Sequence, residues 1–390
     1  MTSKTTACGL FLAIFLMMTG VGMIVAVMPR HYIALSGSPH TVGSLAAAFA
    51  ITYLMVQLVV GRLADRYGFR RFIIAGYFIC AAAGFCFYIS ADALMLILGR
   101  LIQGFGEAPA WSLAPAVLAL QNPARPGRLI GAYSAILHVG LALGPALGIL
   151  CRVIWPEESV FAVFAGLCFC GGWILIGTFR ADAPRQGAPR QTSCRWRLPM
   201  EETAGRALMA TLLGVALYGA GYGTFLTVIP VYLQAAKGFG ETGIALYFSG
   251  FYVAIGSAAL LTGLLGERLG QRRLMAAGLA PAAIAMAFLP AAEGMVLLGL
   301  LFASMLALGI FGMSSLGYLN ALAAPERKGT FSGFYFLAWG LGMFLGPLVI
   351  GGMDALAAPG TGLQSYGVFT GLYSLILGQA LTGEGAVVMD

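Results

Sequence analysis

Long apolar runs alternate with short polar segments along the whole chain, and this alternation sets the expected architecture. A run of about 20 apolar residues spans the roughly 30 Å hydrocarbon core of a membrane. Because lipid offers the backbone no hydrogen-bond partner, each such run is predicted to be a helix. We therefore expect an all-α integral membrane protein with twelve transmembrane helices. The runs are residues 7–28, 41–60, 72–89, 93–120, 129–153, 160–179, 207–233, 242–265, 274–290, 294–322, 331–352 and 366–380.

A charged block between the second and third runs recurs in the second half of the chain. Residues 61–71 read GRLADRYGFRR, and residues 263–273, 202 positions later, read GLLGERLGQRR. Glycines and prolines elsewhere recur near the same offset. An even number of helices in each copy preserves its orientation in the membrane, so the sequence predicts two parallel, pseudo-symmetric six-helix halves. We assign them to residues 1–179 and 207–390, joined by a basic linker at 180–206.

The composition supports this architecture and explains the net charge. Of the 390 residues, 59% are hydrophobic and 9% are charged, whereas soluble proteins carry about 25% charged residues. The net charge of +7 does not indicate a nucleic-acid partner, because the basic residues lie between the helices. Basic loops favour the cytoplasmic side. Both termini are therefore predicted in the cytoplasm, with only Arg30, Arg152 and Lys237 outside and Arg100 within the membrane. We expect a multi-pass protein of a bacterial inner membrane, in contact with membrane lipids.

Signatures of enzymes and cofactors are missing from the sequence. The seven cysteines are dispersed, without a paired CxxC pattern, and are expected to be small apolar side chains rather than disulfides or metal ligands. There is no Walker loop, zinc-ligand spacing or nucleophile–base pair, and Gly104 and Gly106 lie within a span rather than in a dinucleotide loop. We expect no enzymatic activity, no metal and no cofactor.

The fourth span carries the only charged residues deep in the membrane. Arg100, Gln103, Glu107 and Trp111 are spaced i, i+3, i+7 and i+11, which places them on one helical face. Ionisable groups at this depth are costly and usually functional. Since burial and a nearby cation act in opposite directions on the pKa of a carboxyl group, Glu107, helped by Arg100, is predicted to couple protons or to bind a cationic substrate. The alternatives are a structural acid for Glu107 and a hydrogen-bonding centre for Arg100.

Aromatic and polar side chains near mid-span predict a substrate cavity. The candidates are Gln57, Gln103, Trp111, Tyr218, Tyr222, Tyr247, Tyr252, Tyr335 and Trp339. Tyr and Trp also gather at membrane interfaces, which is the alternative explanation. His138 lies about 200° around its helix from Gly140 and is expected to face this cavity and relay protons, unless it is a packed hydrogen-bonding residue.

Three motifs resemble those of the major facilitator superfamily, and the resemblance extends over nearly the whole chain. Residues 61–71 resemble its loop motif G-x-L-x-D-R-x-G-x-R-R, and residues 100–104 its R-x-x-Q-G motif. Residues 131–148 match G-x(8)-G-x(3)-G-P-x(2)-G, which resembles its antiporter motif. The resemblance implies two six-helix bundles that work by alternating access. Glu107 departs from the family pattern, which usually has small residues after R-x-x-Q-G.

The resemblance also implies gating roles. The charged loops would latch the cytoplasmic ends of neighbouring helices in the outward-facing state; their residues are Gly61, Asp65, Arg66, Gly68, Arg70, Arg71, Glu267 and Arg268. In the loop, the arginines can also pair with Asp65 or with lipid phosphates. The alternative is a solvated turn that only sets topology. The glycine ridge of the fifth helix would pack across the halves and close the outer side; its residues are Gly140, Gly144, Pro145 and Gly148.

These features together predict a secondary active transporter, functional as a monomer, that exports a small organic molecule in exchange for protons. The substrate would be a drug-like amphiphile, or a metabolite such as a siderophore. Import by proton symport or facilitated diffusion uses the same fold, although the antiporter motif argues against it. A transporter-like sensor or scaffold that does not transport is the third hypothesis.

Overall fold

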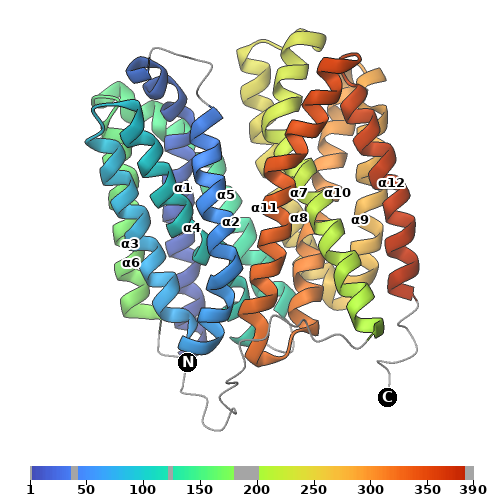
Figure 1. Ribbon diagram of the computed structural model, residues 1–390, viewed down its shortest axis with the longest axis horizontal. Helices are drawn as coiled ribbons and strands as arrows, with labels where there is room; N and C mark the ends of the chain where they lie inside the picture. The colour runs from blue at the N-terminus through green and yellow to red at the C-terminus, as the bar shows by residue number, and fades with distance from the viewer. Residues whose placement is uncertain (1, 37–42, 122–125, 180–201, 383–390) are drawn as a thin grey trace.

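The computed structural model describes residues 2–36, 43–121, 126–179 and 202–382, and this part of the chain contains twelve long α-helices and no strand (Figure 1). Two short 3-10 turns, η2 (Leu289–Ala291) and η3 (Pro325–Arg327), precede α10 and α11. The helices are α1 (Thr2–Ser36), α2 (Gly43–Tyr67), α3 (Phe69–Tyr88), α4 (Ala93–Gln121), α5 (Pro126–Ile154), α6 (Ser159–Thr178), α7 (Glu202–Lys237), α8 (Glu241–Leu269), α9 (Gln271–Phe288), α10 (Gly294–Leu322), α11 (Lys328–Leu356) and α12 (Thr361–Thr382).

The helices form two halves with the same internal packing. In the first half, α1 packs on α5 and α6, α3 packs on α4 and α6, and α2 packs on α4. In the second half, α7 packs on α11 and α12, α9 on α10 and α12, and α8 on α10. Each pair in one half has its counterpart six helices later, as the sequence repeat predicts. Of the predicted linker, residues 180–201 lie outside the described residues, and residues 202–206 begin α7.

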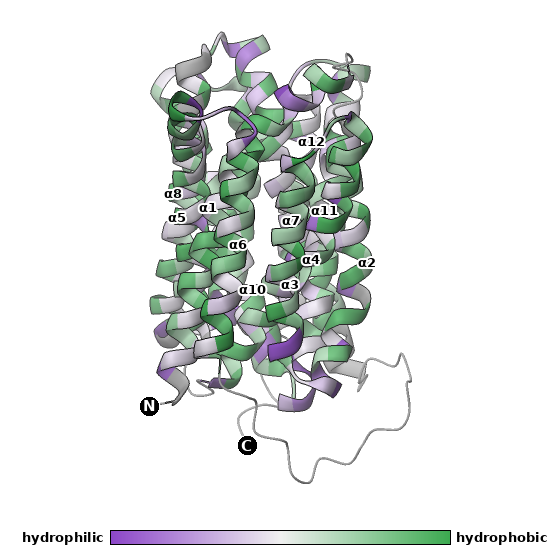
Figure 2. Cartoon of the chain, turned by 90° about the vertical axis from the view of Figure 1, so that its left-hand side faces the viewer, coloured by the Kyte–Doolittle hydropathy of each residue, from purple (hydrophilic) through white to green (hydrophobic). Residues whose placement is uncertain are grey.

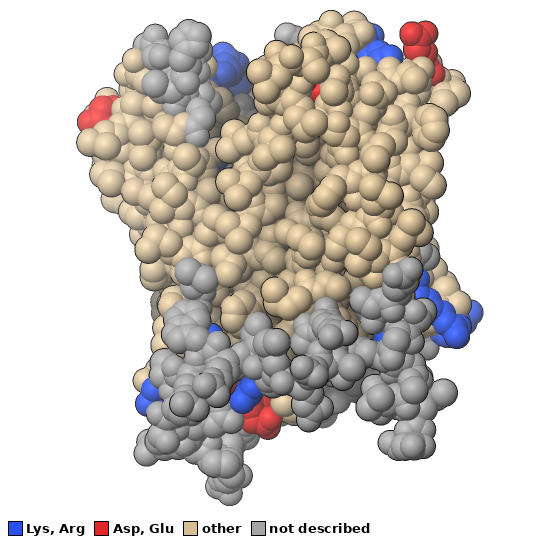
Figure 3. Space-filling view, turned by 45° about the vertical axis from the view of Figure 1, so that its right-hand side comes forward, with Lys and Arg blue, Asp and Glu red and all other residues tan. Residues whose placement is uncertain are grey.

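The surface of the molecule has the polarity expected of a membrane protein. Hydrophobic residues cover the middle of the helices, and hydrophilic ones lie towards their ends (Figure 2). In the space-filling view, Lys, Arg, Asp and Glu appear only near the two ends of the face in view (Figure 3). Among the described residues, nine helices are long and apolar enough to cross a membrane, or ten with the bent α2. The others, α4 and α12, are 29 and 22 residues long, and α4 contains the polar face described below.

The start of α1 and the end of α12 lie at the same end of the molecule, which we call the linker side because α6 ends and α7 begins there (Figure 1). Both charged loops turn at this end. Gly68, between α2 and α3, has φ 90° and ψ 146°, and Gly270, between α8 and α9, has φ 81° and ψ 142°. Only glycine adopts this conformation without strain. This explains why a glycine recurs at both positions.

The two halves meet most closely on the linker side. The principal pairs are α2 with α11 and α5 with α8. A Cβ atom on Gly61 of α2 would lie 2.3 Å from the carbonyl oxygen of Gly329 in α11. A Cβ atom on Gly131 of α5 would lie 2.4 Å from the carbonyl oxygen of Ala259 in α8. At both contacts, the backbones approach each other so closely that any side chain would force the halves apart.

The glycine ridge of α5 is not where the resemblance places it. A Cβ on Gly144 would lie 2.5 Å from the Cα of Gly22, and one on Gly140 would lie 2.9 Å from the carbonyl oxygen of Phe15. Pro145 and Gly148 also lie against α1, beside Gly22 and Met23. The ridge therefore packs on α1 within its own half, and the prediction that it packs across the halves is wrong. Small side chains indicate close helix packing but do not identify the partner helix.

Candidate functional site

The polar face of α4 forms a continuous chain of hydrogen bonds. Nη1 of Arg100 donates to Oε1 of Gln103 at 2.9 Å, and Nε2 of Gln103 donates to Oε1 of Glu107 at 2.6 Å. Nε1 of Trp111 donates to Oε2 of Glu107 at 3.3 Å. The spacing of these residues along one helical face, predicted from the sequence, places each side chain within reach of the next. Both carboxylate oxygens of Glu107 thus accept a hydrogen bond.

The middle of this row of hydrogen bonds is shielded from solvent. It links the cation of Arg100 to the anion of Glu107 through the amide of Gln103. Glu107 is 3% exposed and Gln103 is completely buried. The guanidinium of Arg100 lies over the ring of Phe49, 5.7 Å from its centroid, and that ring contacts Phe344 of α11. The two charges are opposite, so the pair is neutral overall, and Gln103 bridges it. A neutral, bridged pair is tolerated at this depth, although Nε of Arg100 has no hydrogen-bond partner among the described residues.

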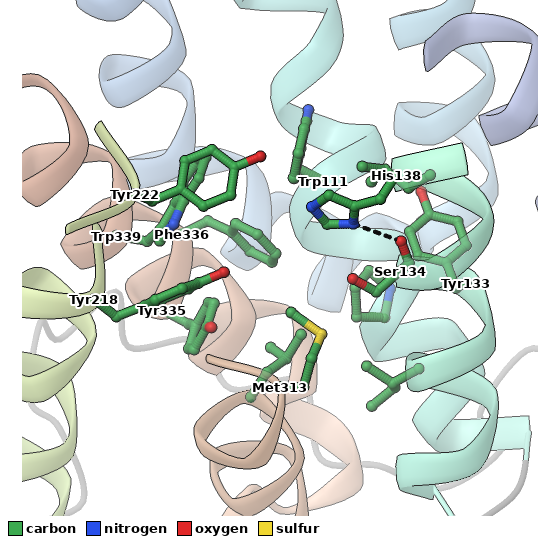
Figure 4. Close-up of a pocket in the computed structure, with 14 residues that line it drawn as sticks. Trp111, Tyr133, Ser134, His138, Tyr218, Tyr222, Met313, Tyr335, Phe336 and Trp339 are labelled. Carbon is green, nitrogen blue, oxygen red and sulfur yellow. Dashed lines mark hydrogen bonds between the residues drawn. The ribbon is translucent and has the colours of Figure 1, made fainter. Parts of the chain in front are cut away.

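A cavity lies next to the end of this chain, between the two halves (Figure 4). The space between its walls that no atom fills measures about 450 Å³, part of which is open to the surroundings. Its wall is mainly aromatic and includes no Asp, Glu, Lys or Arg among the described residues that line it. From the first half these are Trp111, Pro115, Ile130, Tyr133, Ser134, Leu137 and His138, and from the second Tyr218, Tyr222, Met313, Leu316, Tyr335, Phe336 and Trp339.

Trp111 connects the polar chain to the opposite half. Its ring stacks on that of Trp339 in α11, with centroids 5.5 Å apart and an interplanar angle of 22°. It also contacts the ring of Phe336 edge-on. Trp339 is 6% exposed, and its indole Nε1 has no hydrogen-bond partner among the described residues. A movement of Trp111 would therefore change both its hydrogen bond to Glu107 and its stacking on Trp339 in the other half.

His138 lies on the α5 wall of the cavity, facing the second half as predicted. Its Nδ1 is 2.7 Å from the carbonyl oxygen of Ser134. Its ring lies 6.4 Å from those of Tyr222 in α7 and Tyr252 in α8. Figure 4 shows the second ring nitrogen directed into the cavity.

Several predicted cavity residues lie elsewhere. The side chain of Gln103 bonds to Arg100 and Glu107 on its own helix. The hydroxyl of Tyr247 donates to the carbonyl oxygen of Phe225 at 2.6 Å, inside the second half. Gln57 donates to the carbonyl oxygen of Ala108 at 3.3 Å and lines a separate, smaller void on the linker side. The prediction that Gln103, Tyr247 and Gln57 form the cavity wall is therefore wrong, because helix position alone does not reveal bonds that side chains make within their own half.

Four residues of the cavity wall were not predicted from the sequence. They are Tyr133, Ser134, Met313 and Phe336. A signal was available for Ser134 and Phe336, because they lie four residues before His138 and three before Trp339 and so share the faces of these residues. Tyr133 and Met313 carry no such signal.

The charged loop contacts the opposite half through Asp65. Its carboxylate accepts hydrogen bonds from the backbone N–H groups of Gly329 and Thr330, at 2.9 and 2.8 Å, and from the Thr330 hydroxyl at 2.6 Å. These groups form the first turn of α11, where unpaired N–H groups and the helix dipole favour a negative charge. An acid from α2 thus caps the first turn of α11 and joins the two halves on the linker side.

The arginines of the loops have other surroundings. Arg70 donates to the carbonyl oxygens of Phe179 at 2.7 Å and Ile176 at 3.1 Å, at the end of α6, rather than to Asp65 as we allowed. Arg66 lies over the ring of Tyr67, and both Arg71 and Arg268 are exposed. Glu267, the counterpart of Asp65, belongs to α8, and its side chain lies outside the described part of the structure.

Comparisons with known proteins agree with this architecture. The family model of the Major Facilitator Superfamily matches residues 10–347 and, in a second match, 211–382. The chain is 25% identical over 282 residues to Multidrug resistance protein 2 of Bacillus subtilis (strain 168), which covers 70% of this chain and 69% of that protein. It is 29% identical over 140 residues to Quinolone resistance protein NorA of Staphylococcus aureus (strain MRSA252), an alignment that covers 36% of each chain.

A solved structure shows the same fold. The human organic anion transporter MFSD10 (TETRAN) superposes with a TM-score of 0.81, covering 97% of this chain and 100% of that one, at 16% sequence identity. At this identity, the likeness concerns the arrangement of the helices.

Proposed function

The chain belongs to the Major Facilitator Superfamily, and we propose that it exports small organic molecules in exchange for protons. The observation that carries the proposal is the hydrogen-bonded chain on α4, which joins a buried carboxylate to the wall of the cavity between the halves. The names of the multidrug and quinolone resistance relatives support export. The aromatic cavity favours a flat or amphiphilic organic substrate.

Proton binding at Glu107 changes the hydrogen bonds that this residue can make. The ionised carboxylate accepts from both Gln103 and Trp111. A protonated carboxyl group becomes a donor at one oxygen and loses its negative charge, so the hydrogen bonds from these two neighbours weaken and the new O–H needs an acceptor. A buried donor without an acceptor costs free energy. Protonation therefore favours a rearrangement of Gln103 or Trp111.

The charge balance links the same event to the substrate. With Glu107 ionised, its charge offsets that of Arg100, and a cationic or dipolar substrate beside Trp111 is attracted by the carboxylate behind it. With Glu107 protonated, Arg100 carries the only charge among the four hydrogen-bonded residues of the α4 face. In a medium of low dielectric constant, a second cation nearby is then disfavoured. Proton and cationic substrate thus bind in alternation, which is the requirement for exchange.

The arrangement of the halves supplies the access step. Contacts between the halves extend from Asp65 and Gly329 on the linker side to the stacked Trp111 and Trp339 near the cavity. With both termini in the cytoplasm, as the positive-inside pattern predicts, the sealed end is cytoplasmic. This conformation then corresponds to the outward-facing state, and opening of the α2–α11 and α5–α8 contacts gives the inward-facing one.

Transport in everted membrane vesicles tests this proposal, with ethidium as a fluorescent organic cation. An acidic lumen should drive ethidium into vesicles that contain the wild-type protein, and dissipating the pH gradient should stop it. Glu107→Gln should lose nearly all gradient-driven accumulation, since the amide cannot bind the proton. Glu157→Gln is the matched control, because that acid pairs with Arg152 at the far end of α5, away from the cavity.

The direction and gradient dependence distinguish the alternatives. Ethidium accumulation that ignores the pH gradient would rule out proton coupling. Movement of ethidium in the same direction as the protons would indicate symport. Full activity of Glu107→Gln would remove this residue from the coupling mechanism.

A further inference from the structure

Two side-chain nitrogens of residues in the cavity wall, Nε1 of Trp339 and Nε2 of His138, have no hydrogen-bond partner among the described residues, and only that of His138 can accept a hydrogen bond. Nε2 of His138 is buried and makes no hydrogen bond with any described residue. The whole side chain is 3% exposed. Figure 4 shows this nitrogen facing the space between the halves, opposite the tyrosines of α7 and α11. A buried polar atom without a partner is unfavourable, so its position inside a cavity indicates that a ligand completes its hydrogen bonding.

The other ring nitrogen fixes what this atom can do. Nδ1 lies 2.7 Å from the Ser134 carbonyl oxygen, which can only accept. Nδ1 therefore carries the hydrogen, and in the neutral imidazole Nε2 is left as an acceptor. None of the described residues that line the cavity is a carboxylate that would hold a second proton on the ring. The cavity thus presents a hydrogen-bond acceptor on its α5 wall.

The surroundings limit the kind of ligand that can reach this acceptor. The rings of Tyr222 and Tyr252 from the second half lie 6.4 Å from the imidazole. Trp111, Trp339 and Phe336 complete an aromatic wall on the far side. Flat rings pack well against such walls. The ligand therefore combines a ring system with a hydrogen-bond donor at its edge.

We propose that His138 selects substrates by accepting a hydrogen bond, at Nε2, from an N–H or O–H group on a ring-containing molecule. The proposal rests on the export function above only in treating this cavity as the substrate site. It is an alternative to the sequence-based prediction that His138 relays protons, since it uses the imidazole in its neutral form only.

Ligand binding to the purified full-length protein tests the proposal. The probes are 6-aminoquinoline and 6-(dimethylamino)quinoline, which differ by two methyl groups in place of two N–H hydrogens. Quenching of tryptophan fluorescence reports binding, since Trp111 and Trp339 line the cavity. The wild type should bind the amine roughly 3- to 10-fold more tightly than its dimethyl analogue, the range expected for one net hydrogen bond.

Variants locate that preference. His138→Phe keeps a ring against Tyr222 and Tyr252 but removes the acceptor, so the ratio of the two dissociation constants should fall to about one. His138→Gln offers an amide oxygen in its place and should restore part of the ratio. Because the preference is a ratio within one protein, it does not depend on how much of each variant is folded.

The ratio of the two dissociation constants decides whether His138 accepts a hydrogen bond from the ligand. A wild-type ratio near one, or an unchanged ratio in His138→Phe, overturns the proposal. Binding of neither quinoline to the wild type also overturns it, because a ring with a donor would then not be the chemistry this cavity takes. A donor preference that depends on His138, in a protein whose vesicles show no gradient-driven transport of ethidium, would support this inference and refute proton-coupled export.

Discussion

At the scale of single residues, Glu107 and Trp111 form the contact on which the proposed proton coupling depends. The indole N–H donates to the carboxylate at 3.3 Å, while the face of the same ring stacks on Trp339. The two interactions use different parts of one side chain, so a shift of Trp111 changes both at once. In the proposed mechanism, proton binding at Glu107 and substrate binding beside Trp111 therefore affect each other.

Trp111→Phe separates these two interactions. Phenylalanine keeps a ring against Trp339 but cannot donate to Glu107. We expect ethidium to bind this variant within about fivefold of the wild type, since the ring still stacks on Trp339 and the lost indole–carboxylate hydrogen bond does not involve ethidium itself. The dependence of binding on pH should become weaker. Titrations of ethidium fluorescence polarisation over a range of pH measure both effects, and an unchanged pH dependence would show that the indole N–H takes no part in coupling.

Asp65 is the residue that joins the halves on the linker side. It accepts three hydrogen bonds from the first turn of α11, two of them from backbone N–H groups. An acid at a helix N-terminus typically contributes about 1 kcal/mol, and up to about 2 kcal/mol where it is partly buried. Removing its charge should therefore shift the balance between sealed and open states without unfolding either half.

Asp65→Asn should accordingly lower the ratio of sealed to open molecules about fivefold to thirtyfold, in line with these energies. Spin labels on the linker-side ends of α2 and α11 measure the distance by pulsed electron paramagnetic resonance. We expect the long-distance population to grow. Arg71→Gln, an exposed residue of the same loop, is the control and should leave the distribution unchanged. An equal shift in both variants would mean that the loop charge as a whole, rather than the α11 cap, holds the seal.

At the scale of helices, glycines mark two kinds of close packing. Gly61 and Gly131 lie at contacts between the halves, whereas Gly140 and Gly144 lie against α1 within one half. All four belong to repeated sequence patterns. The repeat shows that a helix has a smooth face, but the neighbour of that face depends on how the helices are arranged in three dimensions.

Alanine substitutions should distinguish the two kinds of contact. Gly61→Ala places a Cβ 2.3 Å from the Gly329 carbonyl oxygen and should open the linker side while leaving the thermal stability of the protein nearly unchanged. Gly144→Ala places a Cβ 2.5 Å from Gly22 and should lower the melting temperature by several degrees. Gly250→Ala meets open space and is the control. Thermal unfolding and the α2–α11 distance together check these outcomes, and the reverse pattern would contradict the assignment of the two contacts.

Local sequence predicted the α4 face well and the partners of the other site residues poorly. The order Arg100, Gln103, Glu107 follows from helix geometry alone, because each side chain bonds to a neighbour one turn away. Asp65 bonds to residues 264 and 265 positions later, and no local pattern identifies such a partner. The stacking of Trp111 on Trp339 is hidden for the same reason.

At the scale of the whole molecule, the duplication that the sequence repeat predicts determines how the halves can move. Each helix pair in the first half has a counterpart in the second, so the two halves behave as similar rigid units around a shared cavity. Helix pairs α2–α11 and α5–α8 hold them together on the linker side. Since Asp65 and the Gly61 and Gly131 contacts are short-range, a modest rotation of one half breaks them together and exposes the cavity to that side.

In the proposed mechanism, proton and substrate exclude each other at Glu107. Proton release on ligand binding measures this most directly. Ethidium is added to purified wild-type protein in weakly buffered detergent solution, and the pH change is recorded at several starting pH values. We predict that the wild type releases protons as ethidium binds, whereas Glu107→Gln binds ethidium without releasing any. Binding to the wild type without proton release, or equal release from Glu107→Gln, would contradict the account.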